Sequence, residues 1–217
     1  ELLEDFRACA ADTDLAVQAF FRIRNTQGQL VQFIYNRAQR LLAQRSEGHA
    51  FVRVLKARKL GVSSRRFARD LWICGTQKHQ HRIMLAQDDD AVARLLDDKI
   101  MPLLKDCLVP LNGVYRRSES MLYFPDTDSR YYVGTAGSRT FGRGDDIISR
   151  DFLESAHWKS PAVMAGVEEA QEGVEGEGLL VPRLGLAGAA VLPRRDVCEA
   201  LVVALGLAVL RRVLLAE

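Results

Sequence analysis

The residue types best suited to chemistry lie in a basic segment at residues 56–64, KARKLGVSS. Gly61 lets the backbone approach a ligand closely, and backbone N–H groups at the start of a helix attract phosphate. Ser63 or Ser64 offers a hydroxyl to Mg²⁺, and we assign that role to Ser63. The cations at the front of the segment are Lys56, Arg58 and Lys59. This composition favours the binding of nucleotide phosphates.

The segment departs from the usual phosphate-loop pattern, GxxxxGK[ST]. Val62 stands where that pattern has its lysine, so a compensating cation has to come from the front of the segment. A basic strand-to-helix turn with a glycine is also common in proteins that bind no nucleotide, and these residues alone leave that alternative open.

The segment is positioned by the elements on either side of it. An alternating, β-branched run at 51–55 predicts a strand before it, and apolar residues at helical spacing predict a helix over 64–74 after it. The other predicted elements are a helix over 1–19, a hairpin of strands at 20–23 and 30–33, a helix over 37–44 capped by Asn36, strands at 82–86, 121–124, 131–134 and 147–153, and helices over 88–104 and from 160 or 161 to about 171.

Strands that alternate with helices predict an α/β fold of three layers around a mainly parallel central sheet. Ligands bind such sheets at the carboxyl ends of strands, near a switch in strand order. The segment at 56–64 follows a predicted strand directly, so it lies where chemistry is expected.

Composition bounds the class of protein. Of the 217 residues, 48% are apolar and 27% are charged, which excludes a wholly disordered, collagen-like or disulfide-scaffold protein. The net charge of +2 gives no overall bias toward nucleic acid, although the part before residue 160 is mildly basic. No apolar run reaches the length of a membrane-spanning helix, so we expect no membrane partner and a cytoplasmic protein.

Several residues that can bind metals are interpreted as structural. The four cysteines have no zinc-site spacing, and we expect reduced, buried thiols. His79 and His81 are interpreted as loop residues. The acidic run at 88–90 is interpreted as a helix N-terminal cluster, because acidic side chains are favoured there.

Four stretches together resemble the ATPase domain of phage terminase large subunits, the DNA-packaging motors of tailed bacteriophages. Residues 56–63 are similar to the family's deviant Walker A loop, K-x-R-Q-x-G-[VIK]-[ST]. Residues 33–39, FIYNRAQ, look like its adenine-reading segment, an aromatic residue followed by N-x-x-Q. Residues 132–136 and 142–144 look like its strand ending in T-A and its R-G element, and residues 153–158, LESAHW, are similar to the S-E-x-A-x-W form of its Walker B. The resemblance covers about residues 20 to 170.

The resemblance implies a P-loop NTPase fold of the RecA/ASCE-like type, with ATP and Mg²⁺ as cofactors. Adenine would be read by Gln39, whose amide donates and accepts hydrogen bonds at once. Phosphate contacts are assigned to Lys56, Arg58, Lys59, Gly61, Val62, Ser63 and Ser64.

The resemblance also implies catalytic roles. Glu154 would orient or deprotonate the attacking water. Arg58, or Lys56, would hold the β and γ phosphates. Arg143 would be an arginine finger that reaches a neighbouring subunit's nucleotide, with Arg139 as the reserve candidate.

Two features depart from the family. Leu153 stands where many Walker B strands have an aspartate that supports Mg²⁺, and Asp151 is the candidate substitute. The last part of the chain is rich in Leu, Val, Ala and Gly, and Pro182 interrupts the run at 178–181 where the family has a coupling motif. We therefore expect an N-terminal region over 1–45 with a helix, a hairpin and the adenine-reading segment, and a P-loop ATPase core over 46–175. We expect an atypical tail over 176–217, through a change of reading frame or divergence, without the family's nuclease domain.

The function implied is an ATPase motor domain that couples ATP hydrolysis to packaging of double-stranded DNA into a procapsid in the host cytoplasm. The implied partners are DNA bound without sequence preference, a portal protein, a small terminase subunit and further copies in a ring. The alternatives are a helicase-type motor, a degenerate and non-hydrolysing prophage remnant or nucleotide-binding interaction module, and a small α/β protein whose motif matches are accidental.

Overall fold

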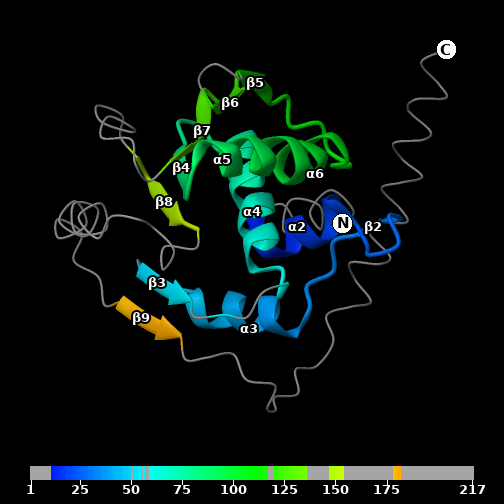
Figure 1. Cartoon of the computed structure of the whole chain (residues 1–217), viewed down its shortest axis with the longest axis vertical. Helices are drawn as coiled ribbons and strands as arrows, with labels where there is room; N and C mark the ends of the chain where they lie inside the picture. The colour runs from blue at the N-terminus through cyan, green and yellow to red at the C-terminus, as the bar shows by residue number, and fades with distance from the viewer. Residues whose placement is uncertain are drawn as a thin grey trace.

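The structure of the chain is a computed structural model (Figure 1). It describes residues 11–49, 51–54, 56, 59–116, 120–135, 147–153 and 178–181. The elements, in chain order, are α2 (Thr13–Phe20), β1 (Arg22–Arg24), β2 (Leu30–Gln32), α3 (Arg37–Ser46), β3 (Phe51–Val54), α4 (Val62–Thr76), β4 (His81–Ala86), α5 (Asp89–Leu95), a π-helical turn (Leu96–Ile100), α6 (Met101–Lys105), β5 (Val114–Arg116), β6 (Met121–Phe124), β7 (Ser129–Thr135), β8 (Ser149–Phe152) and β9 (Gly178–Val181). The chain is therefore a mixed α/β protein, as predicted.

Local sequence explains the first elements. Asp12 caps α2 by accepting hydrogen bonds from the Asp14 and Leu15 N–H groups. β1 and β2 form the predicted antiparallel hairpin. Asn36 caps α3 as predicted, in a capping box with Gln39.

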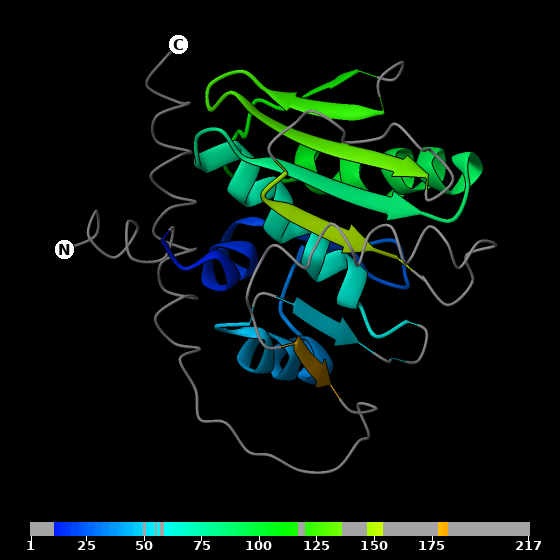
Figure 2. The ribbon, with the colours of Figure 1, turned by 90° about the vertical axis from the view of Figure 1, so that its left-hand side faces the viewer.

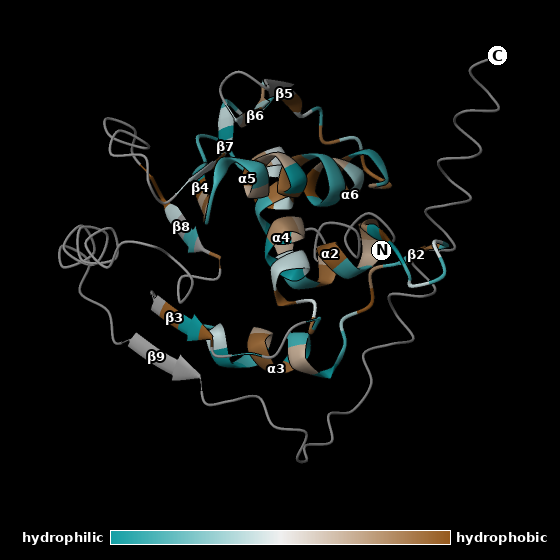
Figure 3. Ribbon diagram, viewed as in Figure 1, coloured by the Kyte–Doolittle hydropathy of each residue, from teal (hydrophilic) through white to brown (hydrophobic). Residues whose placement is uncertain are grey.

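Helix α4 is the central helix of the core. Its buried side chains include Phe67, Leu71 and Trp72. The Trp72 ring stacks on Phe20 of α2 with 5.2 Å between ring centroids, a contact that adds about 1 kcal/mol beyond burial. Figure 3 shows brown, hydrophobic segments of α2 and α4 where the two helices meet. This packing fixes the N-terminal helix against α4.

The long helix predicted over 88–104 is confirmed in extent but not in regularity. Asp88 caps its start by accepting from the Ala91 N–H at 2.7 Å, which confirms the interpretation of the acidic run. The helix then widens into the π-helical turn before Met101. Pro102 explains the change, because a proline inside an α-helix has no N–H and its ring clashes with the carbonyl four residues earlier.

The main sheet is mixed. It has five strands in the order β5-β6-β7-β4-β8, and β4 runs parallel to both β7 and β8. β5 and β6 pair antiparallel, as do β6 and β7, because a tight turn at 125–128 joins the latter two strands. The prediction of a mainly parallel sheet is therefore only partly right, and β5 was not predicted.

β3 and β9 form a separate parallel pair. In Figures 1 and 2, β3 lies beside β8, and the arrows of β8, β3 and β9 point the same way. Helices α2, α4, α5 and α6 lie on one face of the main sheet (Figure 1). Within the described residues the architecture thus has two layers, because the predicted helix from 160 or 161 to 171 lies outside them.

The described tail is short. The strand-like run at 178–181 is β9, and neither the domain boundaries nor a change in reading frame is tested by it. Within the stretches that the structure covers, no helix is long and apolar enough to cross a membrane.

Candidate phosphate-binding loop

The segment at 56–64 connects β3 to the N-terminus of α4, as its sequence predicted. β3 ends at Val54, and β8 and β4 end at Phe152 and Ala86. β4 and β8 are parallel, and Figure 2 shows β3 running in the same sense. The loop therefore follows the carboxyl end of β3, which belongs to the separate β3–β9 pair and runs in the same sense as β4 and β8. Open α/β sheets bind ligands at the carboxyl ends of such strands.

Two described residues of the loop have a left-handed backbone. Lys59 and Gly61 have left-handed φ angles of 62° and 71°, an arrangement that builds anion-binding concavities. Gly61 is the N-cap of α4 and supplies no side-chain cap, and the first helical hydrogen bond runs from Arg65 N–H to the Gly61 carbonyl at 3.0 Å. The N–H groups of the first turn are thus left for a ligand, at the positive end of the helix dipole.

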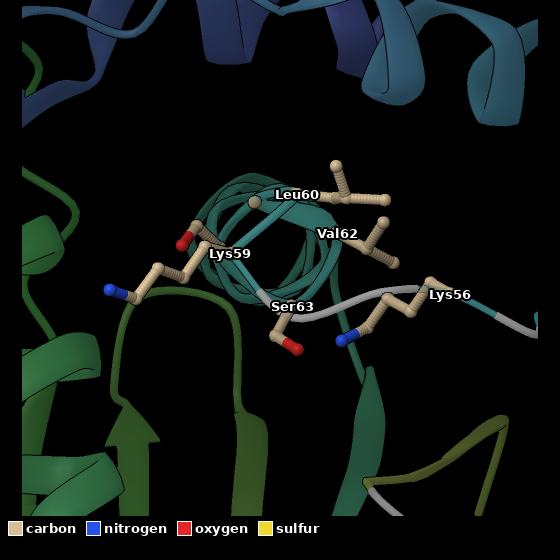
Figure 4. Close-up of a pocket in the computed structure, with 7 residues that line it drawn as sticks. Lys56, Lys59, Leu60, Val62 and Ser63 are labelled. Carbon is tan, nitrogen blue, oxygen red and sulfur yellow. The ribbon is translucent and has the colours of Figure 1, made fainter. Parts of the chain in front are cut away.

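A pocket of about 550 Å³ opens at this helix end, and we call it the loop pocket. It is lined by Lys56, Lys59, Leu60, Gly61, Val62, Ser63 and Ser64. Figure 4 shows the Lys56 amine and the Ser63 hydroxyl pointing toward the same space, whereas the Lys59 amine points to the other side of the helix. The structure therefore brings together six of the residues assigned to phosphate contacts, with Leu60 among them. Of the two lysines, only Lys56 directs its amine toward the Ser63 hydroxyl.

Helix α3 holds the loop through two amide side chains. Asn36 donates from Nδ2 to the Leu60 carbonyl at 3.0 Å, and Gln39 donates from Nε2 to the Gly61 carbonyl at 2.7 Å. The Gln39 Oε1 accepts from the Asn36 N–H at 2.9 Å, and the side chain is only 3% exposed. Gln39 therefore lies against the loop through a hydrogen bond that the sequence reasoning did not predict. Its reading of adenine stays a prediction.

A second cluster anchors the first turns of α4 from α2. Arg65 Nη2 and Nε contact the two Asp14 carboxylate oxygens at 2.7 and 3.1 Å, Arg69 adds a contact at 2.5 Å, and the Tyr35 hydroxyl donates to Asp14 at 2.7 Å. Burial alone would raise the pKa of Asp14, but the hydrogen bond and charge of Arg65, with Arg69, lower it below its usual value. Burial beside the Asp14 carboxylate raises the pKa of Tyr35. This cluster fixes the helix whose N-terminus forms the loop pocket.

Asp151, the candidate substitute for an aspartate before Glu154, contacts α4 instead. Its carboxylate lies 2.5 Å from Arg66 Nε, which is also 3.4 Å from the buried Asp70. Burial, opposed by Arg66 and reinforced by Asp70, raises the pKa of Asp151 to about 7. Asp151 is not among the described residues that line the loop pocket, so its predicted support of Mg²⁺ gains nothing from the structure.

The end of β8 leads into the predicted catalytic residue. Leu153 donates its N–H to the Leu85 carbonyl at 3.0 Å and packs against the core, so it lies at the carboxyl end of β8 beside that of β4. Glu154 follows directly in the sequence and lies outside the described residues. Arg58, Arg139 and Arg143 also lie outside them.

The structure describes two of the four cysteines, and Cys9 and Cys198 lie outside the described residues. Cys74 is a buried free thiol and Cys107 a partly buried one, and burial raises the pKa of Cys107 to about 11. His79 lies in a turn with φ 55°, but His81 begins β4 rather than lying in the loop.

Comparison with models of protein families found none that matches this chain, and comparison with curated proteins found no match.

Proposed function

We propose that this chain is a nucleotide-binding ATPase domain similar to that of phage terminase large subunits. One observation carries the proposal: the loop pocket combines a left-handed Gly61, an α4 N-terminus without a side-chain cap, and the side chains of Lys56 and Ser63 on one side. Together these supply N–H donors, a dipole and a cation for phosphate oxygens.

The arrangement of strands also supports the proposal. β3 precedes the loop, while β8, which precedes Glu154 in the chain, lies beside β3 in both views of the ribbon (Figures 1 and 2). A phosphate-binding loop and a water-activating carboxylate that follow neighbouring parallel strands reach the same edge of a sheet. Phosphoryl transfer needs chiefly such positioning together with charge stabilisation.

Each residue has a separate task in this proposal. Lys56 and the first N–H groups of α4 bind the phosphates, and the Ser63 hydroxyl fits a Mg²⁺ ion that arrives with ATP. The metal would neutralise charge on the phosphates. Glu154 orients or deprotonates the attacking water, and Arg143 of a neighbouring copy would stabilise the developing charge. Coupling of this hydrolysis to the movement of double-stranded DNA rests on the family resemblance.

A second candidate function is nucleotide binding without turnover. Leu153 packs against the core next to the predicted base, and Asp151 is engaged by Arg66. Leu153 has no carboxylate, and the carboxylate of Asp151 is paired with Arg66. Thus neither residue provides the free carboxylate that commonly supports Mg²⁺ just before the catalytic glutamate. The two functions share the loop pocket and differ in hydrolysis alone.

The experiment is to measure MgATP binding and steady-state hydrolysis of the chain and of Glu154→Gln. Removing a general base lowers kcat by about 10²- to 10⁴-fold, so we expect that loss with an unchanged dissociation constant. Binding without hydrolysis in the parent chain would favour the second candidate. A folded chain that binds no nucleotide would contradict both.

A further inference from the structure

The side chain of Arg66 joins the helix behind the loop pocket to the strand that leads to Glu154. Arg66 lies in the second turn of α4. Its Nη2 donates to the Ser149 hydroxyl, and its Nε lies 2.5 Å from the Asp151 carboxylate. Both partners belong to β8 and, two residues apart, face the same side of the strand. One guanidinium therefore fixes α4 to β8 at two points.

The contact is the middle of a longer chain of charges. Asp70, fully buried one helical turn after Arg66, lies 3.4 Å from the Arg66 Nε and 2.7 Å from Arg82 of β4. The four groups, Arg82, Asp70, Arg66 and Asp151, thus alternate in sign and connect β4, α4 and β8. Asp70 is fully buried, whereas the Arg66 side chain is 32% exposed. Displacing Arg66 or Arg82 would leave the buried Asp70 carboxylate with less compensation, so this chain of contacts has little freedom to rearrange.

Strand β8 depends on this connection more than its neighbours do. It is an end strand of the five-stranded sheet and forms its ladder with β4 over four residue pairs. β4 is hydrogen-bonded on both sides. The planar fork of an arginine holds a hydroxyl and a carboxylate in a fixed geometry, whereas the rotatable donors of a lysine on its flexible stem would fix the two partners less firmly.

We propose that Arg66 is a positioning residue that couples occupancy of the loop pocket to the placement of β8, and hence of Glu154. The inference rests on the proposed function, since it needs a nucleotide bound at the N-terminus of α4. A ligand that orders the first turn of α4 also orders Arg66, one turn further on. Arg66 then transmits that order to Ser149 and Asp151, which lie just before Leu153 and the predicted base.

The test is hydrogen–deuterium exchange of the full chain with and without a non-hydrolysable ATP analogue and Mg²⁺. In the parent chain, we expect the analogue to slow exchange of β8 amides by about fivefold, the lower end of typical coupling between sites. In Arg66→Gln, with the analogue at saturation, we expect this slowing to disappear. Arg69→Gln is the matched control, because it removes an arginine of the same helix that pairs with Asp14 and not with β8. Arg65 still contacts both Asp14 carboxylate oxygens in that variant, so α4 stays anchored and the parent's response should be kept.

Arg66→Gln alone leaves the Asp151 carboxylate without its cation and could fail to fold. The double variant Arg66→Gln, Asp151→Asn removes that unpaired carboxylate and is the substitute in that case. If the parent chain binds the analogue and exchange in β8 is not slowed, the inference is overturned but the proposed function is not. The same holds if either Arg66 variant keeps the response, or if Arg69→Gln loses it equally. A parent chain that binds no analogue would overturn the proposed function, and the inference with it.

Discussion

Substitution of Gly61 by alanine should destabilise the protein through contact with Gln39 as well as through backbone strain. An alanine with a left-handed φ costs about 1–2 kcal/mol. A Cβ at Gly61 would also lie 2.7 Å from Gln39 Nε2. Gln39 is buried and hydrogen-bonded at both ends of its amide, so moving it leaves polar atoms without partners at a cost of about 1–3 kcal/mol. The expected total loss is about 2–5 kcal/mol.

The chain contains a matched control for the backbone term. Gly28 has φ 77°, close to the 71° of Gly61, and nothing lies within 4 Å of a Cβ built there. Gly28→Ala should therefore cost only the strain of about 1–2 kcal/mol. Urea titrations followed by circular dichroism give both free energies of unfolding. Equal losses in Gly28→Ala and Gly61→Ala would show that contact with Gln39 adds nothing to the backbone strain.

A double variant locates the clash. If the excess cost of Gly61→Ala arises at the Gln39 amide, it should largely disappear when Gln39→Ala is already present, since the two residues are in contact and their effects are not additive. An excess that stays the same in that background would mean that the strain lies elsewhere in the loop. In that case the contact with Gln39 of α3 would not be the source of the excess cost.

Two further predictions concern the partly buried carboxylates of Asp14 and Asp151. Asp14→Ala leaves Arg65 and Tyr35 without their partner and should lower the free energy of unfolding by about 3–5 kcal/mol near neutral pH. Because the folded pKa of Asp14 is lowered, the parent's advantage over this variant in urea titrations should shrink as pH falls below about 4. An advantage that does not change with pH would contradict this. For Asp151, the raised pKa means that the folded state keeps a proton that the unfolded state releases, so the parent should lose up to about 4 kcal/mol relative to Asp151→Asn between about pH 4 and pH 7. A constant difference between those two proteins across that range would show that the pKa of Asp151 is not raised.

Local patterns predicted most of the secondary structure. The cap at Asn36, the turn between β1 and β2, and the helix after the basic loop are each specified within a few residues of sequence. Pro102 could have indicated the widened turn before α6, but the helical spacing of the apolar residues predicted one regular helix through it.

Contacts between distant residues were not predictable from one sequence. Asp14 meets Arg65 across 51 positions, and Arg66 meets Asp151 across 85. Nothing in residue spacing pairs one arginine with one aspartate among many. Likewise, a motif match assigned Gln39 to adenine, but only the fold shows its hydrogen bond to the Gly61 carbonyl.

The loop pocket is tested most directly by comparing the MgATP affinities of Lys56→Gln and Lys59→Gln by titration calorimetry. Both variants remove one positive charge from the same loop, but only the Lys56 amine points toward the Ser63 hydroxyl. A lost charge-assisted contact of about 1.5–3 kcal/mol predicts about 10- to 100-fold weaker binding for Lys56→Gln. Loss of a screened surface charge predicts less than about fivefold for Lys59→Gln. Equal affinities in the two variants, or no binding by the folded parent, would contradict the assignment of this loop to nucleotide phosphates.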